Sequence, residues 1–128
     1  MCHPNSSPEP ASRGSLACDA GRVIVLVVFV STAHADAVRR AAAAAGAGHI
    51  GNYCACSFSA PGTGRFEPVH GAHPAVGRIG ELEAVAEERI EVVCEREIVR
   101  KVLDAVLAAH PYEEPAYHLY EALDPSSL

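Results

Sequence analysis

An uninterrupted apolar run, Val23 to Val30, sets the strongest limit on the fold of this chain. It consists of Val, Ile, Leu and Phe, with no polar side chain to mark a face in contact with water. A strand with one wet face alternates apolar and polar residues, whereas a continuous run of this length indicates burial on both faces. The sequence therefore predicts a central strand of a sheet.

The same run has an alternative interpretation as part of a secretory signal. Arg22 precedes it, and Ala33 and Ala35 have the spacing of small residues that a signal peptidase accepts. The leader also contains acidic residues that offset its arginines, and the run is far too short to span a bilayer. We therefore expect a cytoplasmic protein without a membrane segment, in which residues 1–22, rich in Pro and Ser, form a disordered leader.

The rest of the chain alternates strand and helix patterns. Apolar residues recur with helical spacing in two segments, Asp36–Ala45 and Glu97–Ala109. Three further strands are expected at Ile50–Ser59, Arg89–Cys94 and Ala116–Leu123, with a long Gly- and Pro-rich loop or hairpin extension at Ala60–Gly80. The predicted order is β-α-β-β-α-β, the ferredoxin-like split βαβ arrangement of the α+β class. We expect one domain over residues 23–124 and a short tail at 125–128.

Composition narrows the possible partners. Ten Lys and Arg against 16 Asp and Glu give a net charge of −6, which argues against nucleic-acid binding because that affinity comes from clustered cations. Seven His and five Cys are a high number for 128 residues and allow a metal site. No Gly-x-Ser-x-Gly or His-Glu-x-x-His motif supports catalysis.

One candidate metal site combines two strand cysteines with two loop histidines. Cys54 and Cys56 would point to one face of a strand, and His70 and His73 follow in the long loop. Two thiolates and two imidazoles suit tetrahedral zinc, although both spacings are tighter than in zinc fingers. The alternative is that the cysteines pack as small apolar side chains beside solvated histidines.

Two further segments could bind a ligand. Gly62, Gly64 and Arg65 could hold an anion through backbone N–H groups and the guanidinium, or could simply form a glycine turn. The segment from His110 to His118 could hold a divalent cation or a polar ligand, or could be a rigid turn whose glutamates accept backbone donors. Its candidate ligand and metal residues are His110, Tyr112, Glu113, Glu114 and His118.

Linked motifs in these segments carry a family resemblance. They are Gly48-His49-Ile50-Gly51-Asn52-Tyr53 with Cys56-Ser57-Phe58, Gly62-x-Gly64-x-Phe66-x-Pro68, Gly71-x-x-Pro74-x-x-Gly77-x-x-Gly80, and His110-Pro111-Tyr112-Glu113-Glu114-Pro115-Ala116-Tyr117. Together they resemble the YqfO-type module, a PII/CutA-like domain that is inserted in dinuclear-metal-centre proteins and also occurs alone. Cys56 and His110 match the family pattern, whereas Cys54, Ala55, His73 and His118 depart from it.

The resemblance implies a ferredoxin-like subunit that packs as a homotrimer and binds small effectors in clefts between subunits. It also places the dinuclear metal ligands of the large proteins in two flanking lobes, for which we expect no residues in this chain. We therefore expect a non-catalytic binding or regulatory module for a small polar effector or a divalent metal such as zinc. The alternatives are a structural or interaction module for a separate dinuclear-metal enzyme, and a small metal-dependent hydrolase.

Overall fold

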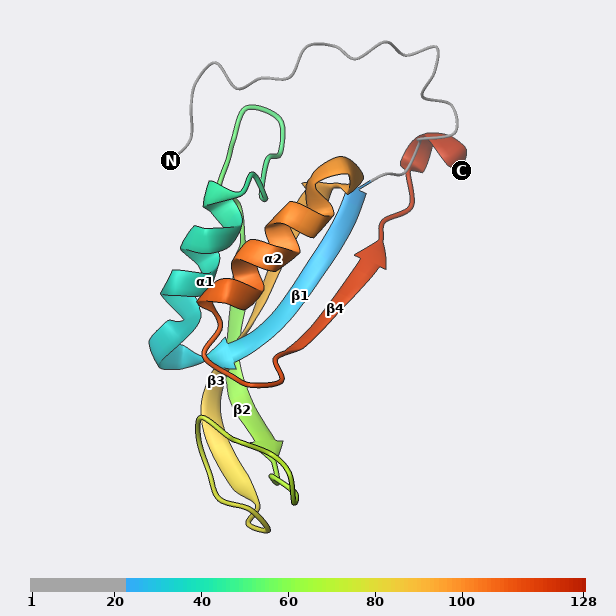
Figure 1. Cartoon of the computed structure of the whole chain (residues 1–128). Helices are drawn as coiled ribbons and strands as arrows, with labels where there is room; N and C mark the ends of the chain where they lie inside the picture. Colours follow the sequence, from blue (N-terminus) through green and yellow to red (C-terminus); the bar gives the residue numbers. More distant parts are fainter. Residues whose placement is uncertain (1–22) are drawn as a thin grey trace.

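The computed structural model describes residues 23–128, so the expected disordered leader lies outside the described residues. These residues form a single four-stranded antiparallel sheet with the order β2-β3-β1-β4. Both helices cover the same face of the sheet (Figure 1). The elements are β1 (Val23–Ser31), α1 (Thr32–Ala44), β2 (Phe58–Phe66), β3 (Glu83–Glu95), a 3-10 turn (Arg96–Ile98), α2 (Val99–Ala109), β4 (Ala116–Glu121) and a final 3-10 turn (Pro125–Ser127). The predicted split βαβ arrangement is confirmed.

The hydrophobic core lies between the sheet and the two helices. Alternate residues of β1, from Ile24 to Val30, point toward the helices and are at most 6% exposed. They pack against Val38 of α1 and Val102 and Val106 of α2, which are completely buried. Complete burial of each such side chain contributes about 1.5–3 kcal/mol, so this layer fixes how the helices sit on the sheet.

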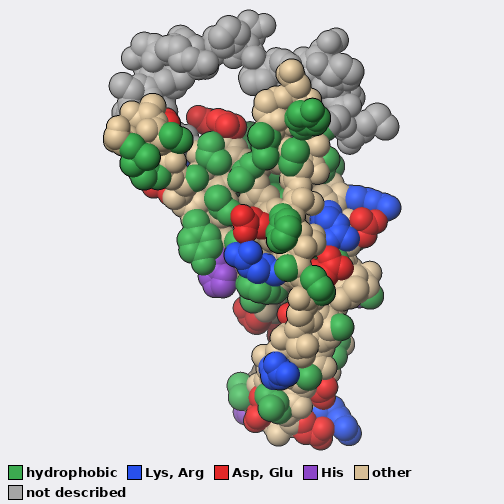
Figure 2. Space-filling view, turned by 180° about the vertical axis from the view of Figure 1, so that it is seen from behind, with side chains coloured by type: hydrophobic (Ala, Val, Ile, Leu, Met, Phe, Trp, Pro, Cys, Tyr) green, Lys and Arg blue, Asp and Glu red, His purple; other side chains and the backbone are tan. Residues whose placement is uncertain are grey.

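The remaining residues of β1 point to the other face of the sheet, which no helix covers (Figure 2). Val27 is 2% exposed although it lies outside the helix-side core, because its register partners Glu91 and His118 flank it there. Phe58 and Tyr120 share this face and are 66% and 55% exposed. We call this surface the open face. Within the described residues, neither helix has the length and apolar character needed to cross a membrane.

The second strand does not lie where the apolar pattern placed it. Ile50 and Tyr53 form only an isolated bridge, and β2 begins at Phe58 and runs through the Gly-rich segment to Phe66. Because β2 is an edge strand paired only with β3, Pro61 needs no partner on the free side. The first part of the segment expected as a loop or hairpin extension, Ala60–Gly80, is therefore a strand. β2 and β3 form a hairpin that extends beyond the ends of the other strands (Figure 1).

The other boundaries differ by a few residues. The helix expected from Asp36 begins at Thr32, directly after β1, and the second helix begins at Val99 after a 3-10 turn. β3 begins at Glu83, well before the expected Arg89, because its first half pairs with the unexpected part of β2. β4 ends at Glu121.

The connection from α1 to β2 is held by backbone contacts at Gly48. Its N–H donates to the Val93 carbonyl at 2.6 Å, and its own carbonyl accepts the Cys56 N–H at 3.0 Å. Gly48 has a φ of +87°, and a Cβ on it would lie 2.6 Å from the Cys56 carbonyl oxygen. Only glycine combines this backbone conformation with so close an approach.

A half-buried arginine joins α1 to the sheet edge. Arg39 donates to Glu88 Oε1 at 2.6 Å and to Ser59 Oγ at 3.0 Å, which ties the helix to both β3 and β2. The side chains of Arg39 and Glu88 are 29% and 19% exposed. The base of the β2–β3 hairpin is therefore fixed to the body of the domain.

Candidate functional site

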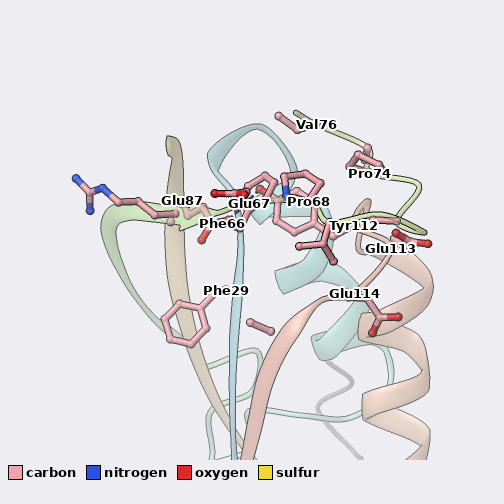
Figure 3. A pocket seen from close by; sticks show the side chains of 16 residues that line it. Phe29, Phe66, Glu67, Pro68, Pro74, Val76, Glu87, Tyr112, Glu113 and Glu114 are labelled. Carbon is pink, nitrogen blue, oxygen red and sulfur yellow. Dashed lines mark hydrogen bonds between the residues drawn. The ribbon is translucent and has the colours of Figure 1, made fainter. Parts of the chain in front are cut away.

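A cavity of about 360 Å³ lies where the β2–β3 connection meets the turn after α2 (Figure 3). We call it the Tyr112 pocket. Its walls come from the end of β1, the end of β2 and the connection after it, β3, the turn after α2 and the start of β4. The lining residues are Phe29, Gly64, Arg65, Phe66, Glu67, Pro68, Val69, Ala72, Pro74, Ala75, Val76, Glu87, Tyr112, Glu113, Glu114 and Ala116.

A hydrogen bond between Tyr112 and Glu87 crosses one side of the pocket. The Tyr112 hydroxyl donates to Glu87 Oε2 at 2.9 Å. The Glu87 carboxylate lies directly against Gly64, so a Cβ at this position would require the Glu87 side chain to move. Burial, together with the hydrogen bond to Glu87 and its negative charge, raises the pKa of Tyr112 to about 12. The phenol therefore stays protonated and acts as a donor at physiological pH.

His110 holds the turn that carries Tyr112. It is 7% exposed, its Nε2 lies 2.7 Å from the Phe29 carbonyl oxygen, and its Nδ1 accepts the Tyr112 backbone N–H at 3.2 Å. A carbonyl can only accept and a backbone N–H can only donate, so Nε2 carries the proton and Nδ1 does not. Both ring nitrogens are thus engaged in positioning Phe29 and Tyr112, two residues of the pocket wall. This structural role of His110 differs from the metal-ligand role that the sequence predicted for it.

Glu113 attaches the β2–β3 connection to the turn. Its Oε1 accepts the backbone N–H of His73 at 2.9 Å, across 40 positions of sequence. The connection is therefore folded over the pocket, with Pro74 and Val76 on the side of Glu113 (Figure 3). The carboxylate of Glu114 is exposed at the same edge.

Most of the predicted ligand residues therefore meet in one place. Gly64, Arg65, Tyr112, Glu113 and Glu114 all line the Tyr112 pocket, although they come from two segments of the chain. Gly62 lies in β2 opposite Glu87 and does not line it. The anion-binding loop expected at Gly62–Arg65 is instead strand β2, whose backbone pairs with β3.

The predicted metal residues are distributed over the molecule. Cys54 and Cys56 lie in the α1–β2 connection, which is not a strand, and His70 and His73 are exposed in the β2–β3 connection. His118 lies on the open face, with its ring centroid 6.2 Å from that of Phe29. Among residues 23–128, no group of three or more His, Cys, Asp or Glu side chains is arranged to hold a metal ion. One protomer therefore does not bring the six candidates together.

Several pocket residues were not predicted from sequence as ligand residues, among them Phe29, Phe66 and Glu87. Phe29 belongs to the apolar run expected to be buried, Phe66 is the last residue of β2, and Glu87 lies among the acidic residues of β3. The sequence feature that could have indicated Glu87 is the pair of glycines, Gly62 and Gly64, in the strand that faces it. This feature can be interpreted only when the β2–β3 register is known.

Comparisons with known proteins agree with this architecture. The chain is 52% identical over 95 residues to a GTP cyclohydrolase 1 type 2 homolog of Halalkalibacterium halodurans, covering 74% of this chain and 26% of that protein. It is 50% identical over 99 residues to the homolog of Mycobacterium leprae, covering 77% and 26%. The chain thus spans about a quarter of the length of these relatives. No protein-family model matches it.

Solved structures of other proteins have the same fold. The Bacillus cereus protein related to NIF3 superposes with a TM-score of 0.70 at 48% identity, covering 82% of this chain and 26% of that one. The PII-like protein CutA from Nostoc superposes with a TM-score of 0.59 at 16% identity, covering 82% and 86%, which shows the fold alone. The homologues of this chain are therefore proteins of the NIF3/YqfO family, one segment of which it matches, and its fold is CutA/PII-like.

Proposed function

We propose that this chain is a non-catalytic, homotrimeric binding or regulatory module whose small ligand occupies the Tyr112 pocket. The observation that carries the proposal is the convergence of two distant motifs on one cavity. Residues of β2 and of the turn after α2 meet there, and the Tyr112–Glu87 hydrogen bond and the Glu113–His73 contact hold the walls together. A cavity with mostly apolar walls and a few convergent polar groups is the usual form of a small-molecule site.

The residues of the pocket favour binding over turnover. Of the residues that line it, none is a Ser, Thr, Cys, Lys or His that could act as a nucleophile or an imidazole base. His110 lies behind the wall with both ring nitrogens engaged. The cyclohydrolase name belongs to proteins of which the matched segment makes up 26%, so this segment would serve such chemistry by sensing or docking.

The open face supports the trimeric part of the proposal. It is a sheet surface with exposed Phe58 and Tyr120 and the buried Val27 at its centre, and neither helix covers it. Exposed aromatic side chains interspersed with charged ones, here Arg89 and Glu91, are a composition that suits a protein interface. A trimer formed through this face would place the Tyr112 pocket beside a neighbouring subunit. A cytoplasmic location is part of the same proposal.

Native mass spectrometry of protein purified without added ligand tests this function. We expect the mass of a trimer with one extra small molecule per subunit. In Ala72→Trp the indole fills the pocket, so the extra mass should be lost while the trimer remains. Ala84→Trp is the matched control, because Ala84 is exposed in β3 and does not line the pocket. A monomer contradicts the assembly, and a trimer without any bound molecule favours a pure interaction module.

A further inference from the structure

The walls of the Tyr112 pocket combine aromatic rings with carboxylates. Phe29, Phe66 and Tyr112 supply three rings, and the centroids of the Phe66 and Tyr112 rings are 6.3 Å apart at 49°. Prolines and small apolar side chains of the β2–β3 connection complete the surface (Figure 3). Aromatic faces carry negative charge density and attract cations, most strongly when water is excluded.

The charged residues of the pocket are predominantly acidic. Four glutamates, Glu67, Glu87, Glu113 and Glu114, line it together with a single arginine. Because successive side chains of a strand point to opposite faces, Arg65 lies on the face of β2 opposite Gly64 and Phe66. The half-buried carboxylate of Glu87 lies within the pocket, whereas those of Glu67, Glu113 and Glu114 are exposed at its rim.

Glu87 is the carboxylate best placed to act on a ligand. It is half-buried, Oε2 accepts the Tyr112 hydroxyl, and it lies against the backbone at Gly64. Its charge and the surrounding burial oppose formation of a second negative charge, as the raised pKa of Tyr112 shows. A phosphate or carboxylate ligand would meet the same opposition.

We propose, on the basis of the proposed function, that the ligand of the Tyr112 pocket is a small organic cation with an alkylammonium group and an apolar portion. The ammonium would lie between the ring faces and Glu87, and the apolar portion would pack against the prolines of the β2–β3 connection. A bare divalent metal ion fits less well, because the described residues offer no group of three metal-ligating side chains. An organic cation satisfies the aromatic, apolar and acidic parts of the wall together.

The test uses three probes of nearly equal shape and different charge. They are choline, its neutral isostere 3,3-dimethylbutan-1-ol, and the anion 3,3-dimethylbutanoate, each titrated into the isotopically labelled full chain while backbone amide shifts are recorded. Choline should shift the amides of Phe66, Glu87 and Tyr112 and bind about tenfold more tightly than the neutral isostere, which corresponds to one good cation–π and carboxylate contact. The anion should not bind.

Three variants test whether choline binding depends on the charge of Glu87 and on the aromatic ring of Phe66. Glu87→Gln keeps an acceptor for the Tyr112 hydroxyl, so it should weaken choline about fivefold or more and leave the neutral isostere unchanged. Phe66→Leu should weaken choline while keeping an apolar wall. Glu97→Gln, an exposed carboxylate in the 3-10 turn before α2, is the control and should have no effect.

The outcomes distinguish the two proposals. If the neutral or anionic probe binds the same residues as tightly as choline, the preference for a cation is wrong and the pocket remains a ligand site. If no probe shifts these amides, the inference is also wrong, and the bound mass in the native spectrum then decides the proposed function separately.

Discussion

Replacement of His110 tests whether this histidine supports the pocket or serves as a metal ligand. In His110→Ala, the Phe29 carbonyl loses a donor at 2.7 Å and the Tyr112 N–H loses an acceptor at 3.2 Å. Each buried polar group left without a partner costs about 1–3 kcal/mol, so we expect a loss of about 3–4 kcal/mol in the free energy of unfolding. The cost is large because His110 is only 7% exposed and water has little access to it.

Two conservative variants divide this effect between the two ring nitrogens. His110→Gln places an amide near the position of Nε2 and can still donate to Phe29, whereas His110→Asn places an oxygen near Nδ1 and can still accept from Tyr112. Each should lose about half of the alanine effect, because each keeps one of the two hydrogen bonds. His70→Ala, in an exposed turn, is the control and should change stability by less than about 0.5 kcal/mol.

The assay is urea unfolding at one protein concentration, because the stability of an oligomer depends on concentration. Each variant is measured with and without EDTA. The reasoning is refuted if His110→Ala is no less stable than His70→Ala, or if EDTA destabilises the wild type and not His110→Ala. The second result would show that His110 stabilises the protein by binding a metal.

Three further changes test other parts of the structure. Gly48→Ala should cost about 3 kcal/mol more than Gly51→Ala in urea unfolding, since both have positive φ but only Gly48 would place a Cβ against backbone; equal losses would contradict the close approach. Arg39→Met should cost about 2 kcal/mol and Arg40→Met less than about 0.5, since only Arg39 ties α1 to β2 and β3; equal effects would contradict the tether. The raised pKa of Tyr112 predicts stability that falls between pH 10 and about 12, because the unfolded phenol ionises first. Tyr112→Phe should flatten that fall, and an unchanged slope in pH-dependent unfolding would exclude Tyr112 as its cause.

The elements predicted well are those whose signal is local. β1 and α2 could be recognised from short stretches of sequence. A strand buried on both faces is a continuous apolar run, and a helix buried along one stripe has apolar residues at helical spacing. The bounds of β2 were predicted wrongly because its residues favour a turn by propensity, although the hairpin extension given as one alternative for Ala60–Gly80 is present as β2 and β3. The strand conformation of β2 depends on pairing with β3 and on the position of Pro61 at the sheet edge. Both are features of the tertiary structure, which the local sequence does not encode.

The site divides in the same way. Tyr112, Glu113 and Glu114 were recognised because they are contiguous in a motif. Glu87 joins them only because β3 places it opposite Gly62 and Ser31, at the level where the turn after α2 reaches the sheet. The histidine count suggested metal, whereas His110 lies in the structure as a bridge between two backbone groups.

A crystal structure of the protein as purified, with whatever molecule the native mass spectrum detects, would show whether the Tyr112 pocket holds a ligand within a trimer. We expect three copies joined through the open face and a small molecule in contact with Tyr112 and Phe66. A ligand bound elsewhere, or a Tyr112 pocket filled by side chains of a neighbouring subunit, would contradict this expectation.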